Sequence, residues 1–580
     1  MNRYLLPCLA ASLVLAACSP SAPEPSAAAA PKAVTSHGFG PEVSAEDFSA
    51  HVRMLASDEF AGRAPGSAGE QLTVDYIQAQ FERLGLKPGN GDSYLQTVPM
   101  VESEVDPSAH LAVQVKGEAL DFAFATDMVI GSRSGQPLVT LESNALVTVT
   151  QQAKVAIENS PLVFVGYGVN APEQGWNDYA GLDVKGKTVV MLVNDPGFHA
   201  GDETLFDGKR MTYYGRWTYK FEEAARQGAS AALIIHDDAG AGYGWGVVQN
   251  SWSGPQFDLP RTVDTEPRLP AQGWLTGDAA KRLFTAAGLD LDALRSAANQ
   301  RGFKPVPLDA SVTTALDIRL KQTQSHNVLG LLPGSTRPDE SVVYMAHWDH
   351  LGTHEGEAGD NIYNGAVDNA SGVAGILEIA EAFVTQNPAP ERSVLFLAVT
   401  LEESGLLGSR YYTAQPVLPL AKTAAVINLD AMPVLGPTRD MVVIGKGNSE
   451  LEDILADIAG KQGRTLVEED APEKGYYFRS DHFNFAKAGV PALYAKGGTD
   501  STEHGKEYVA KATQDYLLNR YHKPFDEFDP AWDLRGVVQD INALYAVGSV
   551  IAGSGQWPSW YDGNAFRAAR EQSAAERATP

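Results

Sequence analysis

The second half of the chain alternates short apolar runs with amphipathic segments, and this alternation constrains the fold more than any other feature of the sequence. A helix is predicted over 371–386, where apolar residues recur every three or four positions. Such alternation is typical of a parallel sheet with helices on both faces. The sequence therefore predicts an α/β fold with a mostly parallel, mixed sheet flanked by helices. Its strands are predicted at 341–346, 393–401, 424–429, 441–444 and 490–495.

Acidic and imidazole side chains follow three of these predicted strands. His347 follows the first strand, the pair Glu402 and Glu403 the second, and Asp430 the third. Because ligands of parallel sheets bind beyond the carboxyl ends of the strands, these side chains are expected to meet at one edge. Buried carboxylates without a partner are unfavourable, and divalent cations would remove that penalty. The pattern predicts a metal-dependent site.

Two further residues extend this set. Asp368 stands where the predicted helix begins, and His522 lies near the end of the chain. Each is weak evidence alone, since an aspartate at that position is usually a helix cap. The two cysteines, Cys8 and Cys18, both lie in or next to the N-terminal apolar segment. Any metal is therefore expected to bind through nitrogen and oxygen atoms.

The composition is that of a globular protein with a strongly acidic surface. The chain has 580 residues, of which 44% are hydrophobic, and two or three domains are expected. The formal net charge of −27 disfavours contact with phosphate backbones. Nucleic acid is therefore excluded from the expected partners, while the oligomeric state is left open.

The N-terminus is predicted to be a processing signal. Residues 1–17 form a signal peptide in this interpretation, because their apolar stretch is too short to cross a bilayer. The Leu-Ala-Ala-Cys sequence at 15–18 resembles the box of bacterial lipoproteins. That resemblance implies a lipid on Cys18, and thus a place in the bacterial cell envelope. Ser19 favours the outer membrane, facing the periplasm.

The rest of the chain is divided by changes in composition. Residues 18–42 are rich in Ala, Pro and Ser and are predicted to be a flexible linker. Residues 139–310 contain strand-like runs and Gly-rich loops without a group of metal ligands, and are predicted to be an inserted module. The catalytic domain is then expected in two parts, 43–138 and 311–555, with a tail at 556–580.

Six short motifs occur in a fixed order. They are His-Trp-Asp at 347–349, Asp-Asn-Ala-Ser-Gly at 368–372, Glu-Glu at 402–403, Asn-Leu-Asp at 428–430, Ser-Asp-His at 480–482 and Tyr-His at 521–522. This order resembles the co-catalytic di-zinc aminopeptidase family, which includes bacterial leucyl aminopeptidases and aminopeptidase Y. The insert resembles a protease-associated domain through Gly-Tyr-Gly at 166–168 and Ala-Ala-Arg-Gln-Gly-Ala at 224–229.

The resemblance implies a ligand set for two Zn²⁺ per chain. His347, Asp368 and Asp430 would hold one ion, and Asp368, Glu403 and His522 the other, so that Asp368 bridges them. Nitrogen and oxygen ligands suit zinc, and a bridging carboxylate suits two neighbouring ions.

The remaining roles are also implied by the resemblance. Asp349 would orient the imidazole of His347, and Glu402 would be the general base. Tyr477 would donate a hydrogen bond to the reaction intermediate. His350 is expected to be a loop residue and is assigned no metal.

The function expected from these residues is hydrolysis of N-terminal peptide bonds by an aminopeptidase. A carboxypeptidase or dipeptidase of the same fold remains an alternative, as does a glutaminyl cyclase with a single metal. A non-catalytic surface protein that binds partners through the insert is the alternative from another class.

Overall fold

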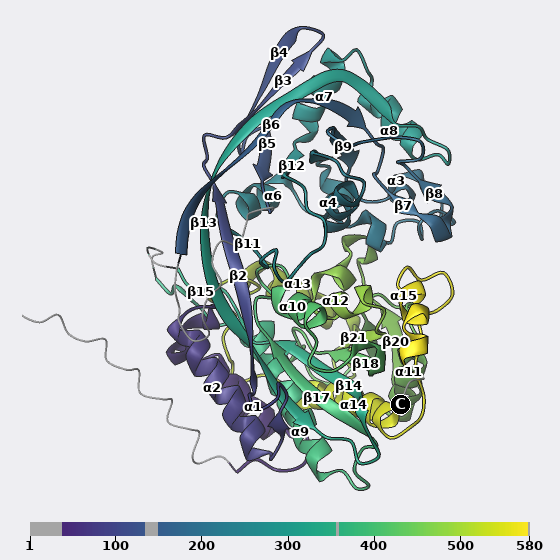
Figure 1. The fold of residues 1–580 in the computed structure, drawn as a ribbon. Coiled ribbons are helices and arrows are strands. Elements are labelled where there is room, and N and C mark those ends of the chain that lie inside the picture. The colour runs from purple at the N-terminus through teal and green to yellow at the C-terminus, as the bar shows by residue number, and fades with distance from the viewer. Residues whose placement is uncertain (1–37, 134–148, 355, 357–358, 578–580) are drawn as a thin grey trace, which may run out of the picture.

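The computed structural model describes residues 38–133, 149–354, 356 and 359–577. The predicted signal peptide and Cys18 lie outside these ranges. The chain forms two lobes, drawn one above the other in Figure 1, and the long strand β13 (Val306–Leu332) runs through both. None of the helices in the described part of the chain is both long and apolar enough to cross a membrane.

The sheet of the lower lobe is mostly parallel, as predicted. β14 (Arg337–His347) lies between β17 (Arg392–Val399) and β18 (Thr423–Asn428), parallel to both. β21 (Ala492–Gly497) continues parallel to β18, whereas β13 pairs antiparallel with β17. At the far edge β19 (Asp440–Val443) is antiparallel to β21 and parallel to β20 (Thr465–Glu468). The prediction of a mostly parallel, mixed α/β sheet is confirmed.

Helices cover both faces of this sheet (Figure 1). Alternate residues of β14 face opposite sides, so Val342 and Tyr344 enter one hydrophobic core and Val343 and Met345 the other. The first core is covered by α1 (Ala45–Leu55), α2 (Ala68–Arg83), α9 (Ser371–Thr385), α11 (Leu451–Lys461) and α14 (Arg535–Ala552), and the second by α10 (Leu407–Ala414) and α12 (His482–Lys487).

The upper lobe has a smaller sheet of its own. β6 (Val149–Phe164), β9 (Thr188–Leu192), β10 (Ala231–Ile235) and β12 (Ala271–Leu275) pair parallel in that order, while β6 also pairs antiparallel with β13, and β5 (Met128–Gly131) pairs antiparallel with β12. The other strands of this lobe and its junction are β2 (Leu95–Val105), β3 (His110–Val115), β4 (Glu118–Ala123), β7 (Asn170–Ala171), β8 (Trp176–Asn177) and β11 (Gln256–Asp258). Its longer helices are α4 (Trp217–Arg226), α6 (Trp245–Trp252), α7 (Gly277–Ala286) and α8 (Leu291–Ala298).

The hydrophobic core of the upper lobe extends beyond the predicted insert. It includes buried residues between 101 and 130, and others between 308 and 320, together with those of the predicted module. The predicted boundaries at 138 and 310 therefore fall inside one packed core. The division into the predicted domains stays a prediction, and these contacts favour boundaries near 100 and 320.

Strand β13 was not expected from the sequence. Its central part buries every second side chain, namely Val312, Thr314, Leu316, Ile318 and Leu320. That alternation over nine residues is the usual signature of a half-buried strand, and it was present in the sequence.

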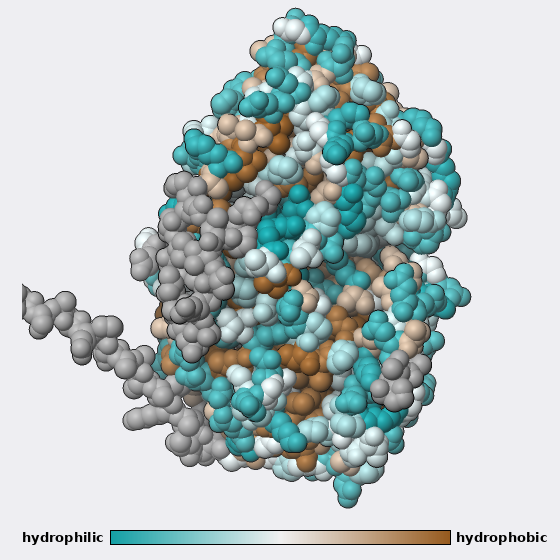
Figure 2. Space-filling view, viewed as in Figure 1, coloured by the Kyte–Doolittle hydropathy of each residue, from teal (hydrophilic) through white to brown (hydrophobic). Residues whose placement is uncertain are grey.

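The surface is hydrophilic over most of the face drawn in Figure 2, with brown hydrophobic areas scattered over both lobes. This agrees with the large excess of acidic side chains in the sequence.

Candidate metal centre

The predicted residues meet at the carboxyl edge of the lower sheet. His347 is the last residue of β14, and Asp430 follows β18 by two residues. Glu402 and Glu403 lie in the loop that follows β17. The three strands are parallel neighbours, so their ends bring these side chains to one place.

Asp368 lies between the two histidines. Its Oδ1 is 3.3 Å from Nε2 of His347, and its Oδ2 is 3.2 Å from Nε2 of His522. On one side His347 Nε2 is also 3.5 Å from Oδ1 of Asp430. On the other, His522 Nε2 is 3.1 Å from Oε2 of Glu403. Two three-residue groups therefore share one carboxylate, in the arrangement expected for two metal ions.

The segment that carries Asp368 is fixed at its backbone. Ala366–Ala370 forms an irregular turn before α9, and the Asp526 carboxylate accepts hydrogen bonds from the N–H groups of Val367 and Asp368, at 3.1 and 3.0 Å. Because these bonds hold the backbone, the Asp368 carboxylate is left free to face the histidines.

Asn369 ties this turn to the end of β18. Its Nδ2 donates to the Leu429 carbonyl at 3.1 Å, and its Oδ1 accepts from the N–H groups of Gly372 and Ala431. A Cβ at Gly372 would lie 2.3 Å from the Asn369 Oδ1 and 2.4 Å from the Leu429 carbonyl oxygen. The sequence Asp-Asn-Ala-Ser-Gly is therefore required to place Asp368 beside Asp430.

The Asp349 side chain connects the loop that follows β14 to the loop that follows β17. Its carboxylate accepts hydrogen bonds from the backbone N–H groups of Glu402 and Glu403, at 3.1 and 3.4 Å. Its contact with the imidazole differs from the prediction: the Asp349 backbone carbonyl lies 3.1 Å from Nδ1 of His347, and the carboxylate is 3.8 Å away. Burial raises the pKa of Asp349 to about 7.

The two adjacent glutamates differ in their surroundings. Glu403 contacts the imidazoles of His350 and His522. Burial and Asp368 act to raise its pKa, but these two histidines outweigh them and lower it to about 2. Within the described ranges no side chain hydrogen bonds to the Glu402 carboxylate. Burial, opposed by His347, raises the pKa of Glu402 well above its ordinary value.

The donor set fits zinc. Two imidazole nitrogens and three carboxylates are gathered with no thiolate, and His347 and Asp368 are almost fully buried. Without a cation the carboxylates of Asp368, Glu403 and Asp430 would lie together at low solvent exposure, which is unfavourable.

Three residues of the site were missed by sequence reasoning. His350 lies in a loop, as expected, but it is buried and its Nδ1 is 2.7 Å from Oε1 of Glu403, which was not expected. Its position three residues after His347 was the available signal. Ser480 Oγ donates to Oδ2 of Asp430 at 2.5 Å. Lys496 lies 3.2 Å from the Tyr494 hydroxyl, which donates to the Asp430 carbonyl.

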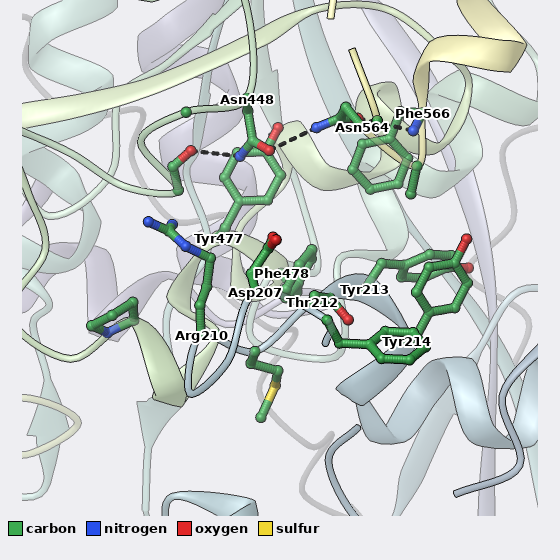
Figure 3. A pocket seen from close by; sticks show the side chains of 18 of the residues that line it. Asp207, Arg210, Thr212, Tyr213, Tyr214, Asn448, Tyr477, Phe478, Asn564 and Phe566 are labelled. Atoms are coloured by element: carbon green, nitrogen blue, oxygen red, sulfur yellow. Dashed lines mark hydrogen bonds between the residues drawn. The ribbon is translucent and has the colours of Figure 1, made fainter. Parts of the chain in front are cut away.

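Tyr477 is not brought into this group of contacts. Its buried ring packs edge-on against His482 at 4.5 Å between centroids, and its hydroxyl has no hydrogen-bond partner among the described residues. Tyr477 lines a cavity of about 320 Å³ between the lobes, whose lining includes Tyr213 and Tyr214 of the upper lobe and Asn448 of the lower (Figure 3). The acid that raises its pKa, after burial, is Glu452 rather than a residue of the metal centre.

Curated relatives match parts of the chain. Aminopeptidase NAALADL1 of Mus musculus is 35% identical over 137 residues, which are 22% of this chain and 17% of that protein. Leupeptin-inactivating enzyme 1 of Streptomyces exfoliatus is 29% identical over 200 residues, 34% of this chain and 42% of that protein. The matched part thus spans less than half the length of these relatives.

A solved structure and a family model also match. The aminopeptidase from Aneurinibacillus sp. strain AM-1 is 18% identical with a TM-score of 0.44, over 89% of this chain and 96% of that one. Residues 327–546 match the model of Peptidase family M28, and every residue of the two metal groups lies within this range. The segment that holds the site, residues 327–546, is therefore similar to Peptidase family M28.

Proposed function

We propose that the protein is a zinc-dependent exopeptidase, specifically an aminopeptidase that removes N-terminal residues from peptides. The observation that carries the proposal is the position of Asp368, whose two oxygens each lie within 3.3 Å of a different imidazole. His347 and Asp430 would hold one Zn²⁺, and Glu403 and His522 a second, with Asp368 shared.

Bound zinc supplies the Lewis acidity that polarises the scissile carbonyl and activates water. The protein supplies proton transfer through Glu402, the glutamate of the pair whose carboxylate accepts no side-chain hydrogen bond from the described residues, whereas Glu403 contacts His522. Glu402 takes a proton from the attacking water and returns it to the leaving amine. The Asp349 carboxylate holds the backbone of Glu402 and Glu403, so that both carboxylates keep their separate orientations.

The setting of the enzyme is part of the proposal. A lipidated Cys18 would tether the protein to a bacterial outer membrane, facing the periplasm, and the upper lobe would act as a protease-associated domain. The support is the Leu-Ala-Ala-Cys sequence at 15–18 and the parallel strands β9, β10 and β12. Globomycin-sensitive processing and labelling with a palmitate analogue would test the anchor, which is wrong if Cys18→Ala leaves both unchanged.

The activity is tested with peptides whose ends are blocked separately. Hydrolysis of leucine 4-nitroanilide and Leu-Gly-Gly, but not of N-acetyl-Leu-Gly-Gly, is expected of an aminopeptidase. Cleavage of the acetylated peptide would instead identify a carboxypeptidase. The metal content is expected to be about two zinc ions per chain, consistent with the two groups that share Asp368. Absence of zinc and of all turnover would favour a binding protein.

A pair of variants assigns the base. Glu402→Gln is expected to retain zinc and to lose about 100- to 10,000-fold in kcat. Glu118→Gln, on the exposed strand β4, is the matched control and should keep full activity. A fully active Glu402→Gln protein would show that another group transfers the proton.

A further inference from the structure

The cavity between the lobes is lined by residues of both. The upper lobe contributes residues between 206 and 214, and the lower lobe contributes the loops at 445–448 and 563–566. Its volume of about 320 Å³ lies at the lower end of the range for small-molecule sites, roughly 300–1,000 Å³. Among the described residues that line it, none belongs to the two metal groups. The cavity is therefore a place of its own, apart from the metal centre.

Direct contacts between the lobes hold the walls of this cavity. The backbone N–H of Met211 in the upper lobe donates to the carbonyl of Pro472 in the lower lobe, at 3.2 Å. The ring of Tyr213 lies 5.7 Å from the ring of Phe566, measured between centroids. Because all four residues line the cavity, its shape is fixed by the protein before any molecule enters.

Aromatic side chains gather in one part of the cavity. Figure 3 shows the rings of Tyr213, Tyr214 and Phe566 on one side, and Arg210 on the other. Phe478 also lines the cavity, and its ring centroid is 6.4 Å from that of Tyr213. Flat rings pack favourably against one another in offset or edge-on arrangements. The lining therefore suits a molecule that carries an aromatic ring.

The lining also carries charges of both signs. Arg210 and Lys446 are its cationic side chains, and Asp207 and Glu173 are among its anionic ones. Lys446 and Asp207 come from opposite lobes and are exposed. Among the described residues, neither forms an ion pair or a side-chain hydrogen bond. A molecule with one anionic and one cationic group could pair with both.

Uncharged polar groups complete the lining. The Tyr477 hydroxyl is buried and has no hydrogen-bond partner among the described residues. A buried hydroxyl without a partner is unfavourable, and a bound molecule with a polar group would supply one. The side-chain amides of Asn448 and Asn564, joined by a hydrogen bond of 2.7 Å, line the cavity as well.

We propose that this cavity binds a free aromatic amino acid, and that the bound molecule holds the two lobes together. Its ring packs among the aromatic side chains, and its carboxylate lies toward Arg210 and Lys446. Its ammonium group lies toward Asp207 and Glu173. The binding does not depend on the proposed peptidase activity, because it uses no residue of the metal centre.

Calorimetry of the full-length zinc-loaded protein with L-phenylalanine measures the binding. A molecule of this size is expected to bind with a Kd on the order of 0.1–1 mM. Phenylalanine amide lacks the carboxylate, 3-phenylpropionate lacks the ammonium group and glycine lacks the ring. Each is expected to bind about tenfold more weakly or worse. Saturating phenylalanine should raise the melting temperature by about 1–3 °C, since it contacts both lobes.

Acetohydroxamate separates this cavity from the metal centre. It chelates zinc but has neither a ring nor a pair of charges, so it should not occupy the cavity. Inhibition of leucine 4-nitroanilide hydrolysis reports that it has bound to the metals. With the metal centre blocked in this way, the Kd of phenylalanine is expected to stay within about twofold of its value in the free protein.

Two variants of exposed residues test the charged contacts. Lys446→Glu and Asp207→Asn should each weaken phenylalanine binding by about tenfold or more. Lys87→Glu and Asp121→Asn are the matched controls, since both residues are exposed and lie outside the cavity lining, and they should bind as the wild type does. Melting temperatures without ligand report on the folding of each variant.

Each result supports or overturns the proposal. Undetectable binding at 10 mM phenylalanine, or displacement by acetohydroxamate, would show that the cavity is not an amino-acid site. Equal affinity for phenylalanine and 3-phenylpropionate, or unchanged affinity in both cavity variants, would overturn the charge pairing and with it the proposed ligand class. If leucine 4-nitroanilide is not hydrolysed but phenylalanine still binds, the proposed peptidase function fails and this site stands.

Discussion

The carboxylate of Asp349 accepts a hydrogen bond from the backbone N–H of Glu402 at 3.1 Å. An aspartate next to a metal-ligand histidine is usually considered a support for the imidazole. Here its carboxylate instead holds the loop after β17, which carries the proposed base. The position of the base is thus fixed from the neighbouring strand β14, which ends at His347.

Asp349→Asn is expected to lower kcat/KM by about 10- to 100-fold while the fold is retained. The amide keeps one acceptor oxygen but turns a donor toward the N–H of Glu402 or Glu403, so one of the two loop contacts is lost. Assays at saturating zinc would measure this, with the exposed Asp317→Asn as control. Activity within twofold of wild type would mean that the loop holds its shape without Asp349.

Gly372→Ala should impair the metal centre from a position that contacts no metal. The added Cβ would lie 2.4 Å from the Leu429 carbonyl oxygen, so the turn that carries Asp368 must shift. We expect at least a tenfold loss of zinc affinity, measured by competition with a chelator. Gly460→Ala is the control: its Cβ meets nothing within 4 Å in α11, and the helix should gain about 0.5–1 kcal/mol.

Removal of zinc should destabilise the protein and not only inactivate it. The buried His347, Asp368 and Asp430 would then face one another without cations. Ligand binding stabilises the folded state by about 2.7 kcal/mol at a free concentration 100 times Kd. A lower melting temperature in chelator, restored by added zinc, is expected; an unchanged melting curve after verified metal loss would contradict it.

Arg63→Lys should destabilise the junction between α1 and the metal centre. The buried Arg63 guanidinium donates to the carbonyls of Leu55, Trp348, Asn364 and Gly365, at 2.6–2.9 Å. Lysine cannot reach all four, and the carbonyls left without a donor should cost about 2–4 kcal/mol of unfolding free energy. Denaturant titration measures the loss, and the exposed Arg282→Lys should be neutral.

The buried carboxyl group of Glu378 is expected to make the stability of the folded protein depend on pH. Burial raises the pKa of this side chain in α9 to about 8, whereas in the unfolded chain it would titrate near its ordinary value. Between those two pH values the unfolded chain releases a proton that the folded protein keeps, so stability falls as the pH rises. In Glu378→Gln this fall should be absent. Relative to the wild type, its unfolding free energy should therefore be higher at pH 8.5 than at pH 5 by about 1–3 kcal/mol.

Unfolding by urea at the two pH values would measure that difference. Glu82→Gln, on the exposed face of α2, is the control and should follow the wild-type curve. If Glu378→Gln has the same pH dependence as the wild type, Glu378 is ionised in the folded protein.

The sequence was sufficient to predict those residues of the site that directly follow an apolar strand. His347 and Asp430 could be placed because each follows an apolar strand, and parallel strands end at one edge. His350 could not, because only the folding of its loop back toward Glu403 brings it into the site. Tyr477 was assigned to the site by resemblance to a motif, whereas in the structure it lines the cavity between the lobes.

Contacts between the lobes could not be predicted from the sequence, for a different reason. Lys487 and Glu222, whose ion pair at 2.8 Å joins the lobes, are separated by more than 200 residues, and no periodicity links them. Their contact depends on how one sheet is packed against the other.

Strand β13 also sets an order of events during synthesis. Its register with β2 pairs Ile318 with Val105, more than 200 residues earlier in the chain. At about 5–20 residues per second, the ribosome would need roughly 10–40 s to supply the later strand. During that interval the emerging β2 has an open edge, and neither lobe can complete its sheet. The upper lobe can therefore complete its sheet only after β13 has emerged, and the lower lobe only after β21 has emerged, so chaperones that shield unpaired edges would act before residue 332 has emerged.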